Sequence, residues 1–312
     1  MTFVVMQKYV NLSRLMAVVA FSAIGLSSCG NISSLSFPQM RWGNKTFGDW
    51  CREKAALSPG ARHTVEVLLR KAKTTECDAA NQKLSSLTKL DLDNNDINDI
   101  KPLESLTKLT ELGLSRNEIS DIKSLESLTN ITILGLENNQ ISDIKPLQSL
   151  TKLSFLTLEN NQISDIKPLQ SLIELDYLTL SYNQIRNIQP LQSLTSLDFL
   201  ELGTNQISDI KPLQSLTQLE SLNLSNNQIN DIKPLQSLTR LSSLGLHNNK
   251  ISDIKPLQSL TRLSSLGLEN NEISDIKLLQ SLTRLSSLGL GGNPISPKTC
   301  PLKPEYICNW AQ

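Results

Sequence analysis

Leucine and isoleucine recur along most of the chain in one fixed pattern. From Leu87 onward the sequence repeats every 22 residues as LxxLxLxxNxIxxIxxLxxLxx, nine times in full and once in part, as far as Ile295. We number the copies as coils one to ten, so that coil five begins at Leu175. A period this strict indicates a solenoid, in which every coil buries its apolar positions against its neighbours.

The first half of each coil predicts a strand. Its LxLx stretch alternates apolar and polar residues, which is the pattern of a short strand with one buried face. Stacked coils would pair these strands in register as a parallel sheet. The asparagine at the ninth position follows the strand in every copy, from Asn95 to Asn293. Its amide can donate and accept hydrogen bonds, so we expect it to satisfy the backbone of a buried turn.

The second half of each coil predicts a short helical return. Its consensus is SDIKPLQSLT, and an Asp shortly before a Pro favours a capped helical turn. Its apolar residues fall every three positions, which suits a 3₁₀ helix better than an α-helix. The Asp and Lys columns, such as Asp143 and Lys145, place opposite charges side by side and predict a solvated, self-neutralising surface.

The 22-residue pattern with its IxxIxxLxxL return resembles the leucine-rich repeats of bacterial internalin-like surface proteins. The resemblance covers residues 87–295. It implies an α/β solenoid shaped as an arc or horseshoe. The parallel sheet would lie on the concave face, which such proteins use for protein recognition, and short 3₁₀ turns would lie on the convex face.

The beginning of the chain predicts export. Two basic residues, Lys8 and Arg14, precede an uncharged apolar run, Leu15–Leu26. This run is shorter than the roughly 20 residues of a membrane span. The run ends in Leu-Ser-Ser-Cys29, which resembles the bacterial lipobox. The resemblance implies a signal peptide over residues 1–28, lipid attachment at Cys29 and a tether over residues 29–36. We expect a cell-envelope protein held to a membrane by this lipid, with plain secretion as the alternative.

Four further cysteines flank the repeats, and an even number in an exported chain predicts disulfides. Of the three possible connectivities, local pairing within each flank is the simplest. The chain contains no CxxC motif and only two histidines, so we predict no metal site and no cofactor. The four cysteines are Cys51, Cys77, Cys300 and Cys308.

The flanks themselves predict caps for the solenoid core. Residues 37–86 read as a helical N-terminal cap, with a helix starting at Ser58-Pro59 and an earlier short helix around Trp50. Residues 296–312 read as a C-terminal cap in which Tyr306, Ile307 and Trp310 cover the last coil.

The outward strand positions predict a binding surface. At the third position, coils three to six carry four large apolar residues within about 15 Å, and each aromatic ring could bury roughly 150–250 Å² against a partner. A contiguous patch of this kind indicates an interaction surface. The alternative is that aromatic residues suit strands and stack on one another. The four are Ile133, Phe155, Tyr177 and Phe199.

Acidic residues and one more tyrosine accompany this patch. Tyr182 follows the strand of coil five, and carboxylates nearby suggest a partner with some positive charge. In coils eight to ten the same positions hold almost only Ser and Gly. The acidic residues on the predicted concave face are Glu137, Glu159 and Glu201, with Asp176 and Asp198 next to them.

Charge and motif content narrow the function. Lys plus Arg equals Asp plus Glu at 30 each, which gives no reason to expect a nucleic-acid partner. No nucleophile elbow, phosphate loop or HExxH motif occurs, and two histidines leave little acid–base chemistry near neutral pH. We therefore predict a non-catalytic protein that binds a protein ligand on its concave face.

Two alternatives to ligand binding are an envelope spacer without a specific ligand and an enzyme acting on glycans. The enzyme would use carboxylates such as Glu159 and Glu201, although an open surface offers no cleft to raise a carboxyl pKa. The sequence indicates no oligomeric state.

Overall fold

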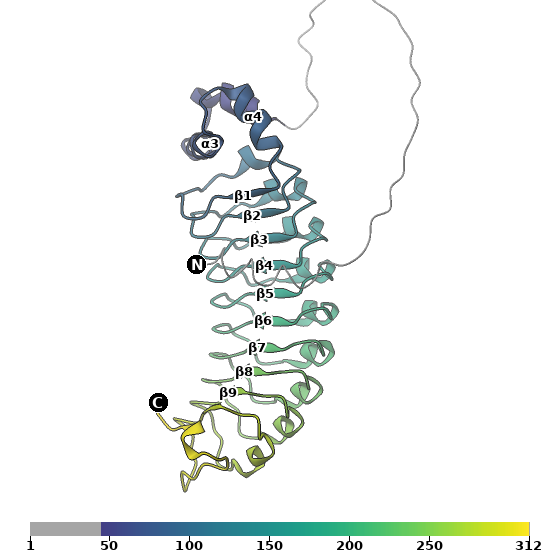
Figure 1. The fold of residues 1–312 in the computed structure, drawn as a ribbon, viewed down its shortest axis with the longest axis vertical. Coiled ribbons are helices and arrows are strands. Elements are labelled where there is room, and N and C mark those ends of the chain that lie inside the picture. The colour runs from purple at the N-terminus through teal and green to yellow at the C-terminus, as the bar shows by residue number, and fades with distance from the viewer. Residues whose placement is uncertain (1–44, 312) are drawn as a thin grey trace, which may run out of the picture. The chain divides into compact units, whose positions relative to one another are not determined.

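The repeating coils build one parallel sheet. The structure, a computed structural model, describes residues 45–311. Within them the sheet has eleven strands in the order β1 to β11, so that neighbours in sequence are neighbours in space (Figure 1). Leu156 pairs with Leu178 and Leu178 with Leu200, which confirms the predicted register. The coils contribute β1 (Lys89–Asp91), β2 (Glu111–Gly113), β3 (Ile133–Gly135), β4 (Phe155–Thr157), β5 (Tyr177–Thr179), β6 (Phe199–Glu201), β7 (Ser221–Asn223), β8 (Ser243–Gly245), β9 (Ser265–Gly267) and β10 (Ser287–Gly289).

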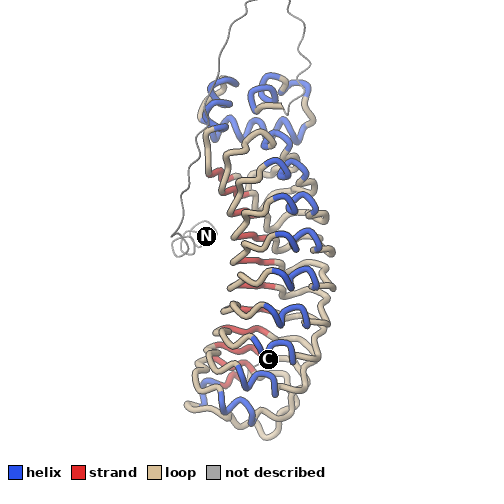
Figure 2. Tube along the Cα trace, turned by 90° about the vertical axis from the view of Figure 1, so that its right-hand side faces the viewer, coloured by secondary structure: helices blue, strands red, loops and turns tan. Residues whose placement is uncertain are grey.

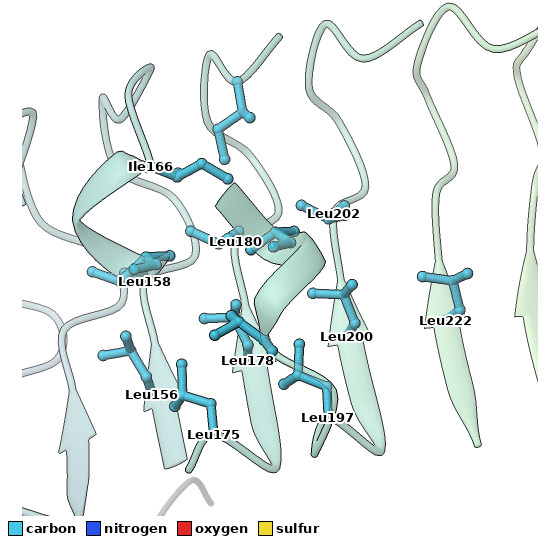
Figure 3. Packing of buried hydrophobic residues seen from close by; sticks show 14 of the residues in the cluster. Leu156, Leu158, Ile166, Leu175, Leu178, Leu180, Leu197, Leu200, Leu202 and Leu222 are labelled. Carbon is cyan, nitrogen blue, oxygen red and sulfur yellow. The ribbon is translucent and has the colours of Figure 1, made fainter. Parts of the chain in front are cut away.

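The hydrophobic core lies on one side of this sheet. Successive side chains of a strand point to opposite faces, so the leucines at the fourth and sixth positions of each coil share the inner face. Leu178 and Leu180 are fully buried there, and Ile166 of the return segment lies in the same cluster (Figure 3). Because one coil cannot bury these residues alone, its stability depends on the coils above and below.

Short 3₁₀ helices form the return segments, as predicted, on the side opposite the strands (Figure 2). The backbone N–H of Lys145 donates to Oδ1 of Asp143 at 2.8 Å, two residues earlier, and the same contact recurs in the other coils that have this Asp. The aspartate thus caps each turn from the residue before its N-cap. The helices are η3 (Lys101–Leu103), η4 (Lys123–Ser127), η5 (Lys145–Ser149), η6 (Lys167–Ser171), η7 (Gln189–Ser193), η8 (Lys211–Ser215), η9 (Lys233–Ser237), η10 (Lys255–Ser259) and η11 (Lys277–Ser281).

The recurrent asparagine forms a ladder from coil to coil. Nδ2 of Asn183 donates to the carbonyl of Leu180 in its own coil at 3.1 Å and to that of Leu158 in the preceding coil at 3.0 Å. Its Oδ1 accepts from the backbone N–H of Ile163 at 2.9 Å. Asn95 of coil one has no earlier coil to reach, and its amide donates to the carbonyl of Asp93. The structural role predicted for these asparagines is confirmed.

Within residues 45–86, three α-helices precede the repeats, namely α2 (Phe47–Arg52), α3 (Pro59–Ala72) and α4 (Cys77–Ser85), with a short 3₁₀ turn, η2 (Lys54–Ala56), after α2. Ser58 caps α3 by accepting the N–H of Ala61, as its Ser-Pro start predicted. The hydroxyl of Thr64 donates to the carbonyl of Asp99 at 2.7 Å, so α3 rests directly on coil one. Helix α4 was not predicted.

Both flanks are closed by local disulfides, Cys51–Cys77 and Cys300–Cys308, so the simplest of the three connectivities is the one observed. The second disulfide holds β11 (Cys308–Asn309), which follows η12 (Glu305–Ile307) and pairs with β10 as an unpredicted eleventh strand. Tyr306 is 85% exposed, so the expectation that it covers the last coil is wrong. It lies in η12 and its side chain extends into solvent.

Candidate protein-binding surface

The four large residues at the third position form one row across the outer face of the sheet, opposite the core. Ile133 pairs with Phe155, Phe155 with Tyr177, and Tyr177 with Phe199. The rings of Phe155 and Tyr177 are stacked with centroids 4.1 Å apart, and those of Tyr177 and Phe199 are stacked at 4.2 Å. We call the three rings the aromatic stack. A strand spacing of about 4.8 Å brings such rings into contact.

The row of four residues is less accessible than we predicted. Ile133 and Phe155 are only 5% and 6% exposed, and Tyr177 and Phe199 are half-buried. The expectation of four solvent-exposed residues is therefore wrong for Ile133 and Phe155, because their neighbours in the row cover their faces. The next residue in the row is Ser221, so the far side of the Phe199 ring adjoins a small side chain. A partner could therefore contact mainly the edges of the rings and the face of the Phe199 ring that adjoins Ser221.

Tyr182, just after β5, does reach solvent, with 55% of its surface exposed. Its backbone is left-handed, with φ of 56°. The eighth position is left-handed in all ten coils, and Asn or Gly occupies it in seven of them. Those residues tolerate this conformation, whereas for others it costs roughly 1–2 kcal/mol. The exceptions are Arg116, Tyr182 and Thr204.

The asparagines at this position also support one another. Nδ2 of Asn160 donates to Oδ1 of Asn138 at 2.9 Å, and Asn248 donates to Asn226 at 2.7 Å. Tyr182 and Thr204 interrupt this second row in coils five and six. Folding alone would favour asparagine at both positions, so Tyr182 needs another explanation.

Carboxylates lie beside the stack where the strands end. Thr179 pairs with Glu201 in the sheet, and Oε2 of Glu201 accepts from Nδ2 of Asn223 at 3.4 Å. Burial raises the pKa of the Glu159 carboxyl above its ordinary value, and the charges of Glu137 and Glu201 raise it further. We expected an open face that leaves carboxyl pKa values unchanged. That is wrong for Glu159, because its neighbours cover part of it.

A second acidic group lies where the strands begin. Burial raises the pKa of Asp176, and the charges of Asp198 and Glu174 add to the effect. Burial also raises the pKa of Asp198, helped by the charge of Glu220, while Arg240 acts in the opposite direction. Arg240 forms a salt bridge with Glu220. Negative charge therefore accumulates on both sides of the aromatic stack.

Two buried hydroxyls separate the stack from the first carboxylate group. Thr157 and Thr179 occupy neighbouring strands and are 3% and 5% exposed. Their Oγ1 atoms have no hydrogen-bond partner among the described residues. Buried polar groups are normally paired, so two orphans side by side on an outer face are unusual.

Ile173 is a feature that the sequence analysis missed. It lies in the turn that leads into β5 and is 55% exposed. The eight other full coils have Thr at this position, from Thr107 to Thr283. That break in an otherwise constant column was the available signal.

Hollows of 640 and 730 Å³ lie elsewhere, between successive 3₁₀ turns, and are lined by polar residues such as Lys167 and Gln170. On the outer face, Nδ1 of His247 lies 2.8 Å from the hydroxyl of Ser225.

Within residues 45–311, no group of three or more His, Cys, Asp or Glu is arranged to hold a metal ion. Over the same range, no helix is both long and apolar enough to cross a membrane. Cys29 and the segments 1–28 and 29–36 lie outside the described residues.

Comparisons with known proteins agree with this fold. A family model for leucine-rich repeats matches residues 85–127, 129–171, 173–215 and 217–259, and no curated protein matches the sequence. The internalin inlF of Listeria monocytogenes is 35% identical, with a TM-score of 0.65 over 78% of each chain. A leucine-rich-repeat protein of Leptospira interrogans is 31% identical, with a TM-score of 0.67 over 74% of this chain and 62% of that one.

A more distant likeness shares the fold alone. The ectodomain of the receptor kinase GASSHO1 from Arabidopsis thaliana, solved in complex with Casparian strip integrity factor 2, is 24% identical with a TM-score of 0.60. The match covers 69% of this chain and 31% of that chain. On the family model and the internalin match together, this chain belongs to the leucine-rich-repeat proteins, with a solenoid similar to that of the bacterial internalins.

Proposed function

We propose that this protein is a non-catalytic recognition protein that binds a protein ligand on the outer face of coils three to six, the predicted concave face. The observation that carries the proposal is Tyr182, an exposed ring at a backbone position where folding favours asparagine. A residue that costs stability and contacts solvent is typical of a binding site. Solenoids of this family commonly bind proteins on such surfaces.

The burial pattern divides the predicted site residues into two roles. Tyr182, the half-buried Tyr177 and Phe199, and the carboxylates Glu159 and Glu201 would contact the ligand, with Glu137 next to them. Ile133 and Phe155 would instead support the stack from its closed end, since little of their surface is left to contact a partner.

We further propose that the protein acts at the cell envelope. Both flanking disulfides suit an oxidising, extracytoplasmic compartment. Lipid attachment at Cys29 would hold the protein to a membrane; secretion without an anchor is the alternative. Incorporation of labelled palmitate should be lost in Cys29→Ala, whereas incorporation that persists in that variant would exclude Cys29 as the attachment site.

Site-specific photocrosslinking of the full chain in its native host tests the recognition proposal. A photoreactive amino acid at position 182 should crosslink to one discrete partner. The same group at Gln148, an exposed residue of η5 on the opposite side, should not. Crosslinking that is absent at 182, or the same at both positions, contradicts the proposal and favours the spacer.

One observation favours a second candidate. The raised pKa of Glu159 is a property of general acids, so a carboxylate-dependent activity on glycans needs a direct test. Turnover of a glycan that Glu159→Gln abolishes would support an enzyme. Equal behaviour of the wild type and Glu159→Gln on a glycan panel would favour the binding protein.

A further inference from the structure

Departures from the repeat gather at the two ends of one strand. Ile173 lies in the turn that enters β5, and Tyr182 lies in the turn that leaves it. Both are 55% exposed, and of the large apolar residues in the described chain only Tyr306 is exposed as well. Between them Tyr177 occupies the centre of the aromatic stack. This line of atypical residues runs along β5, across the stack of coils rather than along it.

Negative charge flanks the aromatic stack toward both ends of this line. Where the strands begin, Asp176 and Asp198 lie close enough for the charge of Asp198 to raise the pKa of Asp176. Where the strands end, Glu159 is flanked by Glu137 and Glu201 in the same way. The apolar centre therefore lies between two acidic groups, and a ligand that matches it carries positive charge on both sides of an apolar residue.

The buried threonines add an observation that is independent of the acidic groups. Thr157 and Thr179 project from the same face as Phe155 and Tyr177, two residues farther along their strands. Each hydroxyl is unpartnered and at least nine-tenths buried, beside the carboxylates. A ligand group that reached this point would give either hydroxyl the partner that it lacks.

The spacing along β5 sets the spacing in the ligand. Three to five residues of strand separate Asp176 from the level of Glu201 and Glu159, which is about 10–16 Å at 3.3 Å per residue. In an extended polypeptide, side chains at i, i+2 and i+4 share one face, and the outer two are about 13 Å apart. The two acidic groups therefore match residues i and i+4, and residue i+2 lies between them on the same face. Tyr177 directly follows Asp176, so the edges of the aromatic stack lie beside the first half of this segment.

We propose that the ligand contacts this surface through an extended polypeptide segment lying along β5, with basic side chains at i and i+4 and an apolar side chain at i+2. The basic side chains meet the Asp176–Asp198 and Glu159–Glu201 groups, and the apolar one rests on the edges of Tyr177 and Phe199. This inference rests on the proposed function and specifies its partner. Coils eight to ten, with Ser and Gly at the same positions, lie outside the contact.

A peptide panel tests the inference with the full chain and fluorescence anisotropy. The parent peptide is fluorescein-labelled GSKGLGKSG. One control peptide moves the second Lys next to the first, one replaces Leu by Ser, and one replaces both Lys by Glu. The parent should bind about tenfold more tightly at low ionic strength than the shifted-Lys and Ser controls, the effect of losing one good contact. The preference over the Glu control should be larger, because that peptide loses both lysine contacts and adds like-charge repulsion. Equal binding of the parent and the shifted-Lys peptide would overturn the spacing argument.

Protein variants show which group meets which lysine. The double variant Asp176→Asn/Asp198→Asn should abolish the contribution of one lysine to peptide binding. The double variant Glu159→Gln/Glu201→Gln should abolish the contribution of the other lysine. Glu272→Gln, outside this face, is the matched control and should change nothing. If both double variants bind the parent peptide like the wild type, the assignment is wrong. A discrete crosslink at position 182 with no peptide binding would refute this inference and leave the proposed function intact, whereas failure of both experiments would refute both.

Discussion

Replacing Tyr182 by asparagine should stabilise the protein and weaken its recognition of a ligand. The left-handed backbone of Tyr182 costs roughly 1–2 kcal/mol that asparagine largely avoids. The new amide can extend the row formed by Asn138 and Asn160, which is worth about 0.5 kcal/mol at an exposed site. The ring is 55% exposed, so its loss uncovers only about 40 Å² of apolar contact, or about 1 kcal/mol. The net expectation is a gain of about 1 kcal/mol.

Thermal and urea unfolding followed by circular dichroism measure this gain. A change of about 1 kcal/mol corresponds to about 2–4 °C in Tm for a chain of roughly this size. The reverse exchange, Asn94→Tyr, is the matched control. Asn94 is exposed and left-handed with φ of 56°, and it lies in coil one, away from the proposed site. It should lose a similar amount of stability and leave crosslinking from position 182 unchanged.

The prediction is strict because stability and ligand binding should change in opposite directions. Most substitutions that remove a binding residue leave stability unchanged or reduce it, whereas this one should raise stability while binding falls. A Tyr182→Asn protein that unfolds at a lower temperature than the wild type would refute the argument from backbone strain. A more stable variant that still binds its partner fully would refute the assignment of Tyr182 to the site.

Three further predictions concern the rest of the fold. Asn183→Ala leaves the buried N–H of Ile163 unpaired and removes one of the two side-chain hydrogen bonds to each of the carbonyls of Leu158 and Leu180, so it should cost about 2–4 kcal/mol in urea unfolding. Asn95→Ala, with its single side-chain bond, should cost about 1 kcal/mol, and equal losses would contradict the ladder. Replacing Cys51 and Cys77 together by Ser opens a loop of 26 residues and should cost about 3–4 kcal/mol, measured as the shift in the urea midpoint. The pKa of Glu159 is raised in the folded state, so that state holds the proton more tightly than the unfolded chain, and stability falls as pH rises through the raised pKa. Glu159→Gln should therefore be more stable than the wild type at about pH 7 and no more stable at about pH 3, below both pKa values; a stability difference that does not change with pH would contradict this.

The repeat made the fold predictable from sequence because one physical solution has to serve every coil. The period of two in the strand, the period of three in the return and the constant asparagine each predict one contact, and the structure repeats each contact in coil after coil. Outside the repeat that redundancy is missing. Helix α4 has a mostly polar sequence, and the two residues of β11 carry no strand pattern of their own, because pairing with β10 determines their conformation.

The candidate site was predictable only in part. Sequence position correctly places Phe155 and Tyr177 on the outer face, but it says little about exposure, which depends on how neighbouring rings pack. The raised carboxyl pKa values were missed for the same reason. Tyr182 was found as an aromatic residue, but its main significance, the left-handed backbone, emerges only from the φ angle that it shares with nine other coils.

The near identity of coils eight to ten has a consequence for how this chain can change over time. All three carry the same Arg-Leu-Ser-Ser-Leu-Gly-Leu stretch, and each pairs in register with the next. Unequal recombination between such copies adds or removes whole multiples of 22 residues, which returns every leucine and asparagine to an equivalent place. The length of the protein can therefore drift at this end while coil five keeps its neighbours, and homologous chains of different lengths can retain the same outer face around coil five.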